Sequence, residues 1–147
     1  MDERTGIDDE WLGGLEELRV DECLRLLRSG VLGRVGLQAE GHPVIVPVNY
    51  AVVENAVVLR TAPGVKLAAA LARTEVAFEV DGVEDDGARG WSVLVIGHAT
   101  ELRDAGSLEE ARRLAISPWA PGEREHYVAI PIERVTGRRF GGAPDAA

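Results

Sequence analysis

The chain of 147 residues has little of several residue types, and each scarcity excludes a class of protein. Cys23 is the one cysteine, so no disulfide can form within the chain. Together with three scattered histidines, at positions 42, 98 and 126, it does not make the ligand set of a structural zinc site. No apolar run approaches the length that spans a bilayer, and no signal peptide opens the sequence. We therefore expect a cytoplasmic protein that has no membrane partner.

Basic residues are also scarce, with 16 lysines and arginines against 25 acidic residues and a net charge of −9. A protein that binds nucleic acid needs a basic patch, because phosphate contacts dominate the affinity. Arg138 and Arg139 form the one local basic pair of note, so we expect no nucleic-acid partner. Lysine is the rarest basic residue, with Lys66 alone beside 15 arginines.

The length fits one domain that can bury a core without disulfides or a structural metal. We expect a flexible acidic tail over residues 1–15, a folded domain over 16–140, and a flexible tail over 141–147. Apolar patterning and turn residues predict about six strands, over 31–37, 43–53, 56–62, 76–80, 91–102 and 127–140. Six antiparallel strands with short inserted helices are enough to close a small barrel.

Local signals predict three short helices and several breaks. Asp21 is expected to cap the first helix and Gly30 to end it. The second helix is expected over 64–73, and the third over 108–115, where Ser107 and Glu110 form a capping box. The apolar run 43–53 predicts a strand buried on both faces, and 81–90 an acidic hairpin loop. Further breaks are expected at Gly97, Pro131 and Gly137, the last two within 127–140.

The strongest local motif is the segment R-T-A-P-G-V-K, residues 60–66. A strand leads through a Pro-Gly turn into a helix, whose first backbone N–H groups favour an anion. Arg60 offers a planar fork for phosphate oxygens, Thr61 a hydroxyl, and Lys66 a cation in the first helical turn. This pattern predicts a bound phosphate, but surface charges that pair with glutamates would give the same residues. The motif alone leaves both interpretations open.

A second motif, P-V-I-V-P-V-N-Y, occupies residues 43–50. Pro47 cannot donate to a strand ladder, so pairing should be interrupted there and leave backbone groups for the edge of a flat heterocycle. Asn49 and Tyr50 would add an amide and a ring. A plain bulge or an edge position also explains Pro47, and on this segment alone that explanation is favoured.

Two tryptophans, Trp91 and Trp119, could wall a flat cofactor, although most tryptophans belong to a core or an interface. The sequence offers no nucleophile-and-base pattern of the Ser-His-Asp or Cys-His kind. Any chemistry would therefore belong to a bound cofactor.

The order of these segments resembles the pyridoxamine 5′-phosphate oxidase-like proteins that have the FMN-binding split barrel. The resemblance covers roughly residues 22–140 and includes V-A-F-E-V-D and G-W-S-V-L-V-I-G-H-A after the Ala-rich helix. The branch it suggests includes nitroimidazole-resistance proteins. It implies a mainly β, six-stranded antiparallel split barrel that forms a homodimer, with FMN at the dimer interface.

The resemblance also implies roles for particular residues. Those expected to bind the cofactor are Pro47, Val48, Asn49, Tyr50, Arg60, Thr61, Lys66, Leu67, Trp91, Ser92 and Trp119. The chain lacks the C-terminal segment with Arg and His with which pyridoxamine phosphate oxidases hold their substrate. It also has Arg60 where nitroimidazole-resistance members carry a histidine. Both departures put those two activities in doubt.

Two hypotheses about function remain open at this stage. The first is an oxidoreductase in which reduced FMN, or a deazaflavin coenzyme, acts on an unidentified small molecule. The second is a non-enzymatic protein that binds flavin, deazaflavin or haem. A barrel that has lost its cofactor and serves as an interaction protein is a third.

Overall fold

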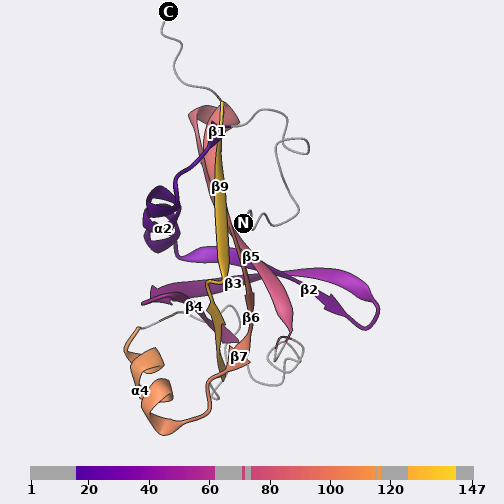
Figure 1. Ribbon diagram of the computed structural model, residues 1–147, viewed down its shortest axis with the longest axis vertical. Coiled ribbons are helices and arrows are strands. Elements are labelled where there is room, and N and C mark those ends of the chain that lie inside the picture. The colour runs from indigo at the N-terminus through magenta and orange to yellow at the C-terminus, as the bar shows by residue number, and fades with distance from the viewer. Residues whose placement is uncertain (1–15, 62–70, 72–73, 115, 117–125, 142–147) are drawn as a thin grey trace, which may run out of the picture.

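The computed structural model describes residues 16–61, 71, 74–114, 116 and 126–141 (Figure 1). These residues form mainly antiparallel β structure with two helices. The elements are β1 (Glu16–Glu17), α2 (Val20–Ser29), β2 (Leu32–Ala39), β3 (His42–Val53), β4 (Ala56–Thr61), β5 (Glu75–Glu84), β6 (Arg89–His98), β7 (Thr100–Glu101), α4 (Ala105–Arg113), β8 (His126–Pro131) and β9 (Arg134–Phe140). No helix in this part of the chain is long and apolar enough to cross a membrane.

The strands follow the order β1-β9-β6-β5-β2-β3-β4-β8-β7. The structure has nine strands where the sequence predicts six, because β1 and β7 are only two residues long and segment 127–140 divides into β8 and β9. The chain passes from β6 through Ala99 directly into β7, which pairs with β8 at the other end of the order. The sheet therefore curls back toward itself, with α2 beside β9 and α4 near β7 (Figure 1).

The long strand β3 pairs with β2 through residues 42–49 and with β4 through residues 50–53. The backbone N–H of Tyr50 donates to the carbonyl of Val31 at 3.0 Å. Hydrogen-bonded positions alternate along an antiparallel pair, so the nitrogen of Pro47, three residues earlier, points away from β2. Pairing continues through Arg34 and Pro47 without a break, so the predicted interruption is wrong and the edge-position alternative is correct.

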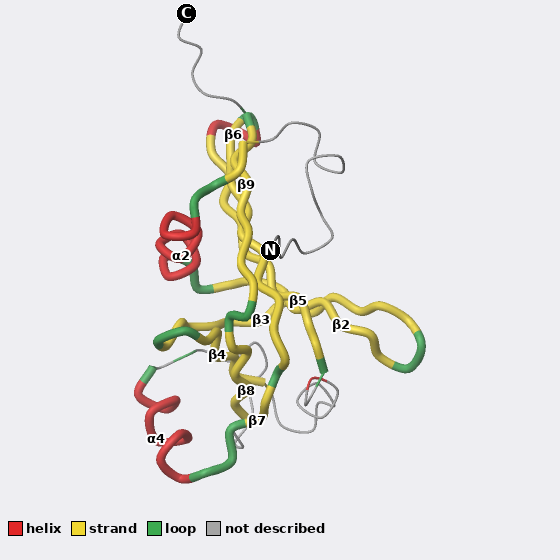
Figure 2. Tube along the Cα trace, viewed as in Figure 1, coloured by secondary structure: helices red, strands yellow, loops and turns green. Residues whose placement is uncertain are grey.

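Strand β3 is not buried on both faces, which corrects a second prediction about this segment. Pro47 is exposed, and the side chain of Ile45 is 73% exposed. Successive side chains point to opposite faces, and only one of these faces is covered in the described chain. Figure 2 shows the β2–β3 hairpin extending away from the rest of the sheet, which leaves that part of β3 open to solvent.

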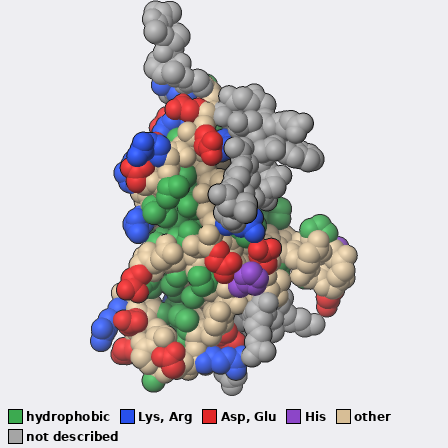
Figure 3. All heavy atoms as spheres, in the orientation of Figure 1, with side chains coloured by type: hydrophobic (Ala, Val, Ile, Leu, Met, Phe, Trp, Pro, Cys, Tyr) green, Lys and Arg blue, Asp and Glu red, His purple; other side chains and the backbone are tan. Residues whose placement is uncertain are grey.

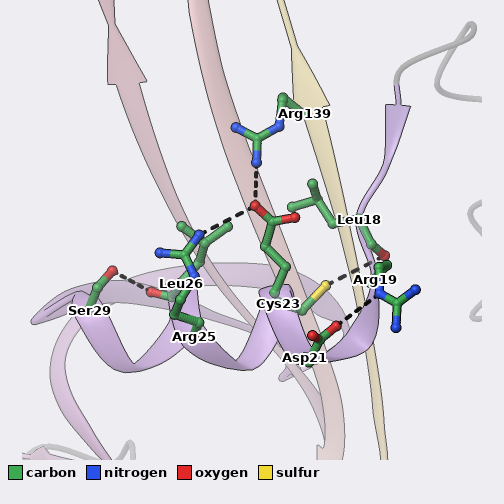
Figure 4. A network of polar contacts seen from close by, with 9 residues as sticks. Leu18, Arg19, Asp21, Cys23, Arg25, Leu26, Ser29 and Arg139 are labelled. Carbon is green, nitrogen blue, oxygen red and sulfur yellow. Dashed lines mark hydrogen bonds and ion pairs between the residues drawn. The ribbon is translucent and has the colours of Figure 1, made fainter.

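The N-cap of helix α2 is Arg19, two residues before the predicted cap, Asp21. Asp21 lies in the first turn, where its negative carboxylate interacts favourably with the positive end of the helix dipole. The same carboxylate accepts a hydrogen bond from Arg19 Nε at 3.3 Å. Glu22 lies between Arg25 and Arg139 and joins the helix to β9 (Figure 4). Arg139, one member of the basic pair at residues 138 and 139, thus stabilises the packing of α2 on β9. Gly30 ends the helix as predicted.

Helix α4 also begins earlier than predicted. Its cap is Asp104, whose carboxylate accepts from the backbone N–H of Ser107 at 2.9 Å. Ser107 therefore lies in the first turn and does not cap the helix. The predicted capping box of Ser107 with Glu110 is wrong. The predicted helix 64–73 falls outside the described residues except for Leu71, which is fully buried.

The β5–β6 hairpin is longer than its acidic sequence suggests. Residues 81–84 and 89–92 pair in register, so the predicted loop 81–90 shrinks to a tight turn. The expected kink at Gly97 occurs instead at Ala99, between β6 and β7. Gly97 stays within β6, where a side-chain Cβ would lie 2.0 Å from the carbonyl oxygen of Pro131. The chain does break after Pro131, but Gly137 stays inside β9.

The core of the described chain has two parts. The larger part lies between α2 and the sheet and contains Leu27, Tyr50 and Phe78. The smaller part lies beneath α4 and contains Val58, Ala111, Ile116 and Tyr127.

Candidate functional site

A groove of about 590 Å³ lies between the C-terminal end of α2 and the segment that follows α4. It is lined by Arg28, Gly30, Val31, Asn49, Tyr50, Ala51, Val52, Leu114 and Ile116. Figure 3 shows hydrophobic side chains gathered on this side of the molecule, between the charged surfaces above and below them. The lining of the groove combines apolar side chains with one guanidinium, that of Arg28, and one side-chain amide, that of Asn49.

Tyr50 forms part of the groove wall, but its side chain belongs to the core. It is 4% exposed, and its hydroxyl donates to the carbonyl of Leu27, in the last turn of α2, at 2.5 Å. Its ring meets Phe78 edge to face with centroids 4.7 Å apart. Burial raises the pKa of Tyr50 to about 12, so the phenol stays protonated. The hydroxyl thus stabilises the helix end, and the expected role of Tyr50 beside a cofactor stays a prediction.

Gly30 allows Tyr50 to approach the helix end. A Cβ at position 30 would lie 2.5 Å from the Tyr50 hydroxyl oxygen. Its backbone is extended, so the reason for glycine here is this close approach and not an unusual φ angle.

Arg60 and Thr61 lie at the end of β4, beside the groove. Arg60 is half-buried, and its Nη1 donates to the carbonyl of Ile116, a lining residue, at 2.9 Å. Thr61 is 4% exposed and its hydroxyl donates to the carbonyl of His126 at 3.4 Å. Arg60 therefore places a positive charge at the groove wall, whereas the Thr61 hydroxyl proton is used within the sheet.

Three further predicted residues lie on β3 next to this point. Val48 is 3% exposed and belongs to the core, so only its backbone could reach a ligand. Pro47 is exposed, and half-buried Asn49 lines the groove. The β3–β4 ladder ends at the pair of Tyr50 with Leu59, so β4 separates from β3 where Asn49 begins. The structure thus brings Asn49, Tyr50 and Arg60 together.

Trp91 and Ser92 are not part of this groove. They lie on β6, and two strands, β5 and β2, separate β6 from β3. Three strand spacings amount to about 14 Å. Trp91 packs over Gly82, where a Cβ would meet its Nε1 at 2.6 Å. Of the other predicted residues, Lys66, Leu67 and Trp119 lie outside the described residues.

The sequence analysis missed several of the lining residues, including Arg28 and Leu114. No sequence motif marks them, because the end of α2 and the end of α4 are far apart along the chain. The guanidinium of Arg28, a lining residue, donates to the carbonyl of Glu54 at 3.5 Å.

A second polar cluster, also missed, lies on the sheet. Arg34 on β2 contacts Glu79 at 2.6 Å and Asp81 at 3.1 Å on β5. Burial and the neighbouring Asp81 raise the pKa of Glu79 to about 7, against the opposing effect of Arg34. Strand alternation could have placed these three side chains on one face once the β2–β5 pairing was known.

A third group lies where β6 ends, next to the β8–β9 turn. Glu75, His98 and Glu133 have potential metal-ligating atoms within 4.8 Å of one another, and all three residues are exposed. The Glu133 carboxylate accepts from the backbone N–H of His98 at 3.0 Å. This contact holds the turn, so the fold by itself accounts for the position of Glu133.

Comparisons with known proteins agree with this architecture. Residues 19–139 match the family described as pyridoxamine 5′-phosphate oxidase. The uncharacterized protein Rv0080 of Mycobacterium tuberculosis is 39% identical over 129 residues, which are 84% of each chain.

Two solved structures extend the comparison. The FAD binding protein from Mycobacterium smegmatis is 38% identical, with a TM-score of 0.73 over 84% of this chain and 98% of the other. The FAD and heme binding protein from the same organism is 20% identical, with a TM-score of 0.67 over 90% of this chain and 77% of the other, and shows the shared fold alone. The match over most of the folded chain and the 39% identical relative lead to one conclusion: this chain belongs to the pyridoxamine 5′-phosphate oxidase family.

Proposed function

We propose that the chain binds a flavin nucleotide in the groove between α2 and α4, with FMN as the preferred candidate. We further propose that it serves as a flavin-dependent oxidoreductase. The observation that carries this proposal is the position of Arg60 against Ile116 in the wall of a groove of about 590 Å³. That volume is within the usual range for small-molecule sites, which combine apolar walls with a few polar groups.

The residues of the groove fit the two ends of a flavin nucleotide. Arg60 and Arg28 supply positive charge for a phosphate, which guanidinium groups bind well. Val31, Val52 and Leu114 supply apolar surface for a flat ring. Asn49 supplies an amide where β3 parts from β4. The bound flavin would supply the redox chemistry, while the chain positions it and excludes water.

The choice among cofactors is part of the proposal. FMN is what the resemblance of the sequence implies, with its phosphate held by the motif at residues 60–66, whereas the 38% identical neighbour is an FAD binding protein. Deazaflavin and haem are the alternatives, and haem is supported by the fold shared with the FAD and heme binding protein. The visible spectrum of the purified protein separates flavin from haem, and mass spectrometry of the released cofactor separates FMN, FAD and deazaflavin. A haem spectrum, or no retained cofactor after incubation with each flavin, would refute the flavin proposal.

The phosphate assignment is tested by FMN titration of Arg60→Met. Loss of a charged hydrogen bond costs about 1.5–3 kcal/mol, so we expect about tenfold to a hundredfold weaker binding. Lys66→Ala should give a loss of the same size. Arg19→Met is the matched control, because the Arg19 side chain is 86% exposed on the far end of α2. Unchanged FMN affinity in both variants would exclude this phosphate site.

The distinction between an enzyme and a carrier rests on turnover. A flavin that is reduced by a nicotinamide donor and reoxidised over many cycles supports the oxidoreductase. A tightly bound flavin that stays inert supports the second candidate, a non-enzymatic carrier, which is favoured by the lack of any clear substrate-gripping residue in the sequence.

The proposal includes a homodimer and a small-molecule substrate. Trp91 and Ser92, expected at the site, are about 14 Å from β3 within one chain. A second copy could supply them, so the site of one chain would be completed by its partner.

A further inference from the structure

A histidine and two glutamates come together from three parts of the chain at one end of the main sheet. Glu75 at the start of β5 and His98 at the end of β6 are direct cross-strand partners, so their side chains lie on the same face of the sheet. Glu133 reaches them from the turn between β8 and β9. We name these three residues the carboxylate–histidine group. None of them lines the groove between α2 and α4, so the group is separate from the proposed flavin site.

Backbone hydrogen bonds hold the three segments of the group together. The N–H of Ala99 donates to the carbonyl of Thr74 at 3.1 Å, and the N–H of Glu133 donates to the carbonyl of Ile96 at 3.1 Å. The Oε2 atom of Glu133 accepts from the backbone N–H of His98 at 3.0 Å, which leaves Oε1 beside the imidazole. The fold thus positions two donor atoms before any ligand binds, which lowers the cost of ordering them.

The distances within the carboxylate–histidine group suit a single metal ion. The potential ligand atoms of all three residues lie within 4.8 Å of one another. Ligands about 2.1 Å from one ion are about 3.0 Å apart when they are adjacent and at right angles, and about 4.2 Å apart when they are opposite. The 3.0 Å between His98 Nδ1 and Glu133 Oε1 matches the first of these separations. The Glu75 side chain is 51% exposed, so a small rotation is enough to bring its carboxylate to the same ion.

The charges of the group favour a cation between the two glutamates. Hydrogen bonds from His98 lower the pKa of Glu133, so its carboxyl is ionised at neutral pH and repels the carboxylate of Glu75. Arg134 Nη2 lies 4.0 Å from the Glu75 carboxylate, beyond hydrogen-bond distance, and compensates it only loosely. A divalent ion would compensate both carboxylates at once and replace the proton between His98 and Glu133.

The group also lies beside a second groove, which makes a bound ion accessible. The β2–β5 ladder ends at the pair of Gly36 with Ala77, and beyond this pair the β2–β3 hairpin extends away from the sheet (Figure 2). The groove that opens there has a volume of about 340 Å³ and is lined by Glu75 and Ile96 among others. Three protein ligands leave coordination positions of an ion free, so water or a small molecule in this groove would complete them.

We propose that the carboxylate–histidine group binds one divalent transition-metal ion, through His98 Nδ1 and one carboxylate oxygen each of Glu75 and Glu133. This site goes beyond the flavin-dependent function and does not depend on it. Imidazole is a good ligand for transition ions such as Zn²⁺ and Ni²⁺, whereas Mg²⁺ and Ca²⁺ prefer oxygen ligands. We therefore expect Zn²⁺ to bind in the presence of excess Mg²⁺, which occupies sites made of carboxylates alone.

The experiment is calorimetric titration of the full chain with ZnCl₂ in excess MgCl₂, where one Zn²⁺ per chain should bind with micromolar affinity. His98→Asn removes the nitrogen ligand and Glu75→Gln removes an oxygen ligand. Each should weaken Zn²⁺ binding at least about tenfold, since even residues behind the ligands change metal affinity by that much. His126→Asn is the matched control and should bind Zn²⁺ as the unmodified chain does. His126 Nδ1 also lies 3.0 Å from a carboxylate, that of Glu101, but the third group there is a cation, Arg103.

Circular dichroism checks that each variant is folded. Glu75→Gln keeps the test informative if His98→Asn does not fold, because the Glu75 side chain makes no hydrogen bond within the described part of the chain. The inference would be overturned by an unmodified chain that binds no Zn²⁺, by unchanged affinity in Glu75→Gln, or by an equal loss in His126→Asn. Flavin retention is measured on the same samples. A chain that binds Zn²⁺ as expected but no flavin would refute the proposed function alone, and a flavin-bound chain without Zn²⁺ affinity would refute the inference alone.

Discussion

Replacing Tyr50 by Phe tests how the groove wall is built, because it removes one atom from a buried contact. The hydroxyl of Tyr50 donates to the Leu27 carbonyl, one of the last four carbonyls of α2, which have no partner within the helix. Tyr50 is 4% exposed, so water cannot easily replace the lost donor. An unsatisfied buried acceptor costs about 1–3 kcal/mol, and we expect the free energy of unfolding to fall by that amount.

The assay is equilibrium unfolding in urea, with Ser29→Ala as the matched control. Ser29 also donates its hydroxyl to a carbonyl in the same turn, that of Leu26 at 2.7 Å, but Ser29 is exposed. Its loss should cost no more than about 0.5 kcal/mol, because water can take its place. A Tyr50→Phe variant as stable as the unmodified chain would refute the argument from burial. A loss of flavin affinity without a loss of stability would show that the hydroxyl serves the cofactor and not the helix.

Two further predictions concern single contacts. Asp104→Ala removes the side-chain cap of α4 and should lower the free energy of unfolding by about 1 kcal/mol. Replacing Glu110, an exposed residue of the same helix, by Ala should cost less, and equal losses would contradict the cap. Glu79→Gln tests the raised pKa of Glu79. The folded chain holds the Glu79 proton up to about pH 7, and the unfolded chain releases it from about 4.5. The stability due to Glu79 is therefore lost as the pH rises through this window, so Glu79→Gln should raise the melting temperature above pH 7 and leave it unchanged near pH 4. A difference in melting temperature that does not change with pH would refute the raised pKa of Glu79.

Composition and local pattern were sufficient for the strand-rich character of the chain and for most of its elements. Runs of Val, Leu and Ile between turn residues predict the strands around β2, β3, β4 and β6, because these residue types are enriched in extended backbone. The end of α2 at Gly30 and the break after Pro131 follow from the residues there. The order of the motifs was sufficient to recognise the family.

Local pattern failed where a distant strand decides the outcome. The acidic segment 81–90 predicts a loop, yet residues 81–84 pair in register with β6, since backbone pairing does not depend on side-chain polarity. Pro47 predicts an interruption, yet its nitrogen faces away from β2, and that depends on which ladder positions are hydrogen-bonded. The caps of the two helices were missed by two and three residues, because Asp21 and Ser107 are plausible caps by residue type and only the backbone conformation selects among neighbouring positions.

The candidate site, like the fold, has features that the sequence predicts and features that only the structure reveals. The sequence by itself determined that Arg60 and the segment around Asn49 are unusual, because a planar cation at a strand end and a proline inside a strand have local meaning. Only the tertiary structure decided that Tyr50 stabilises the end of α2, that Arg28 and Ile116 line the groove, and that two strands separate Ser92 from β3. These facts depend on contacts between residues far apart in the chain, which no local pattern of residues records.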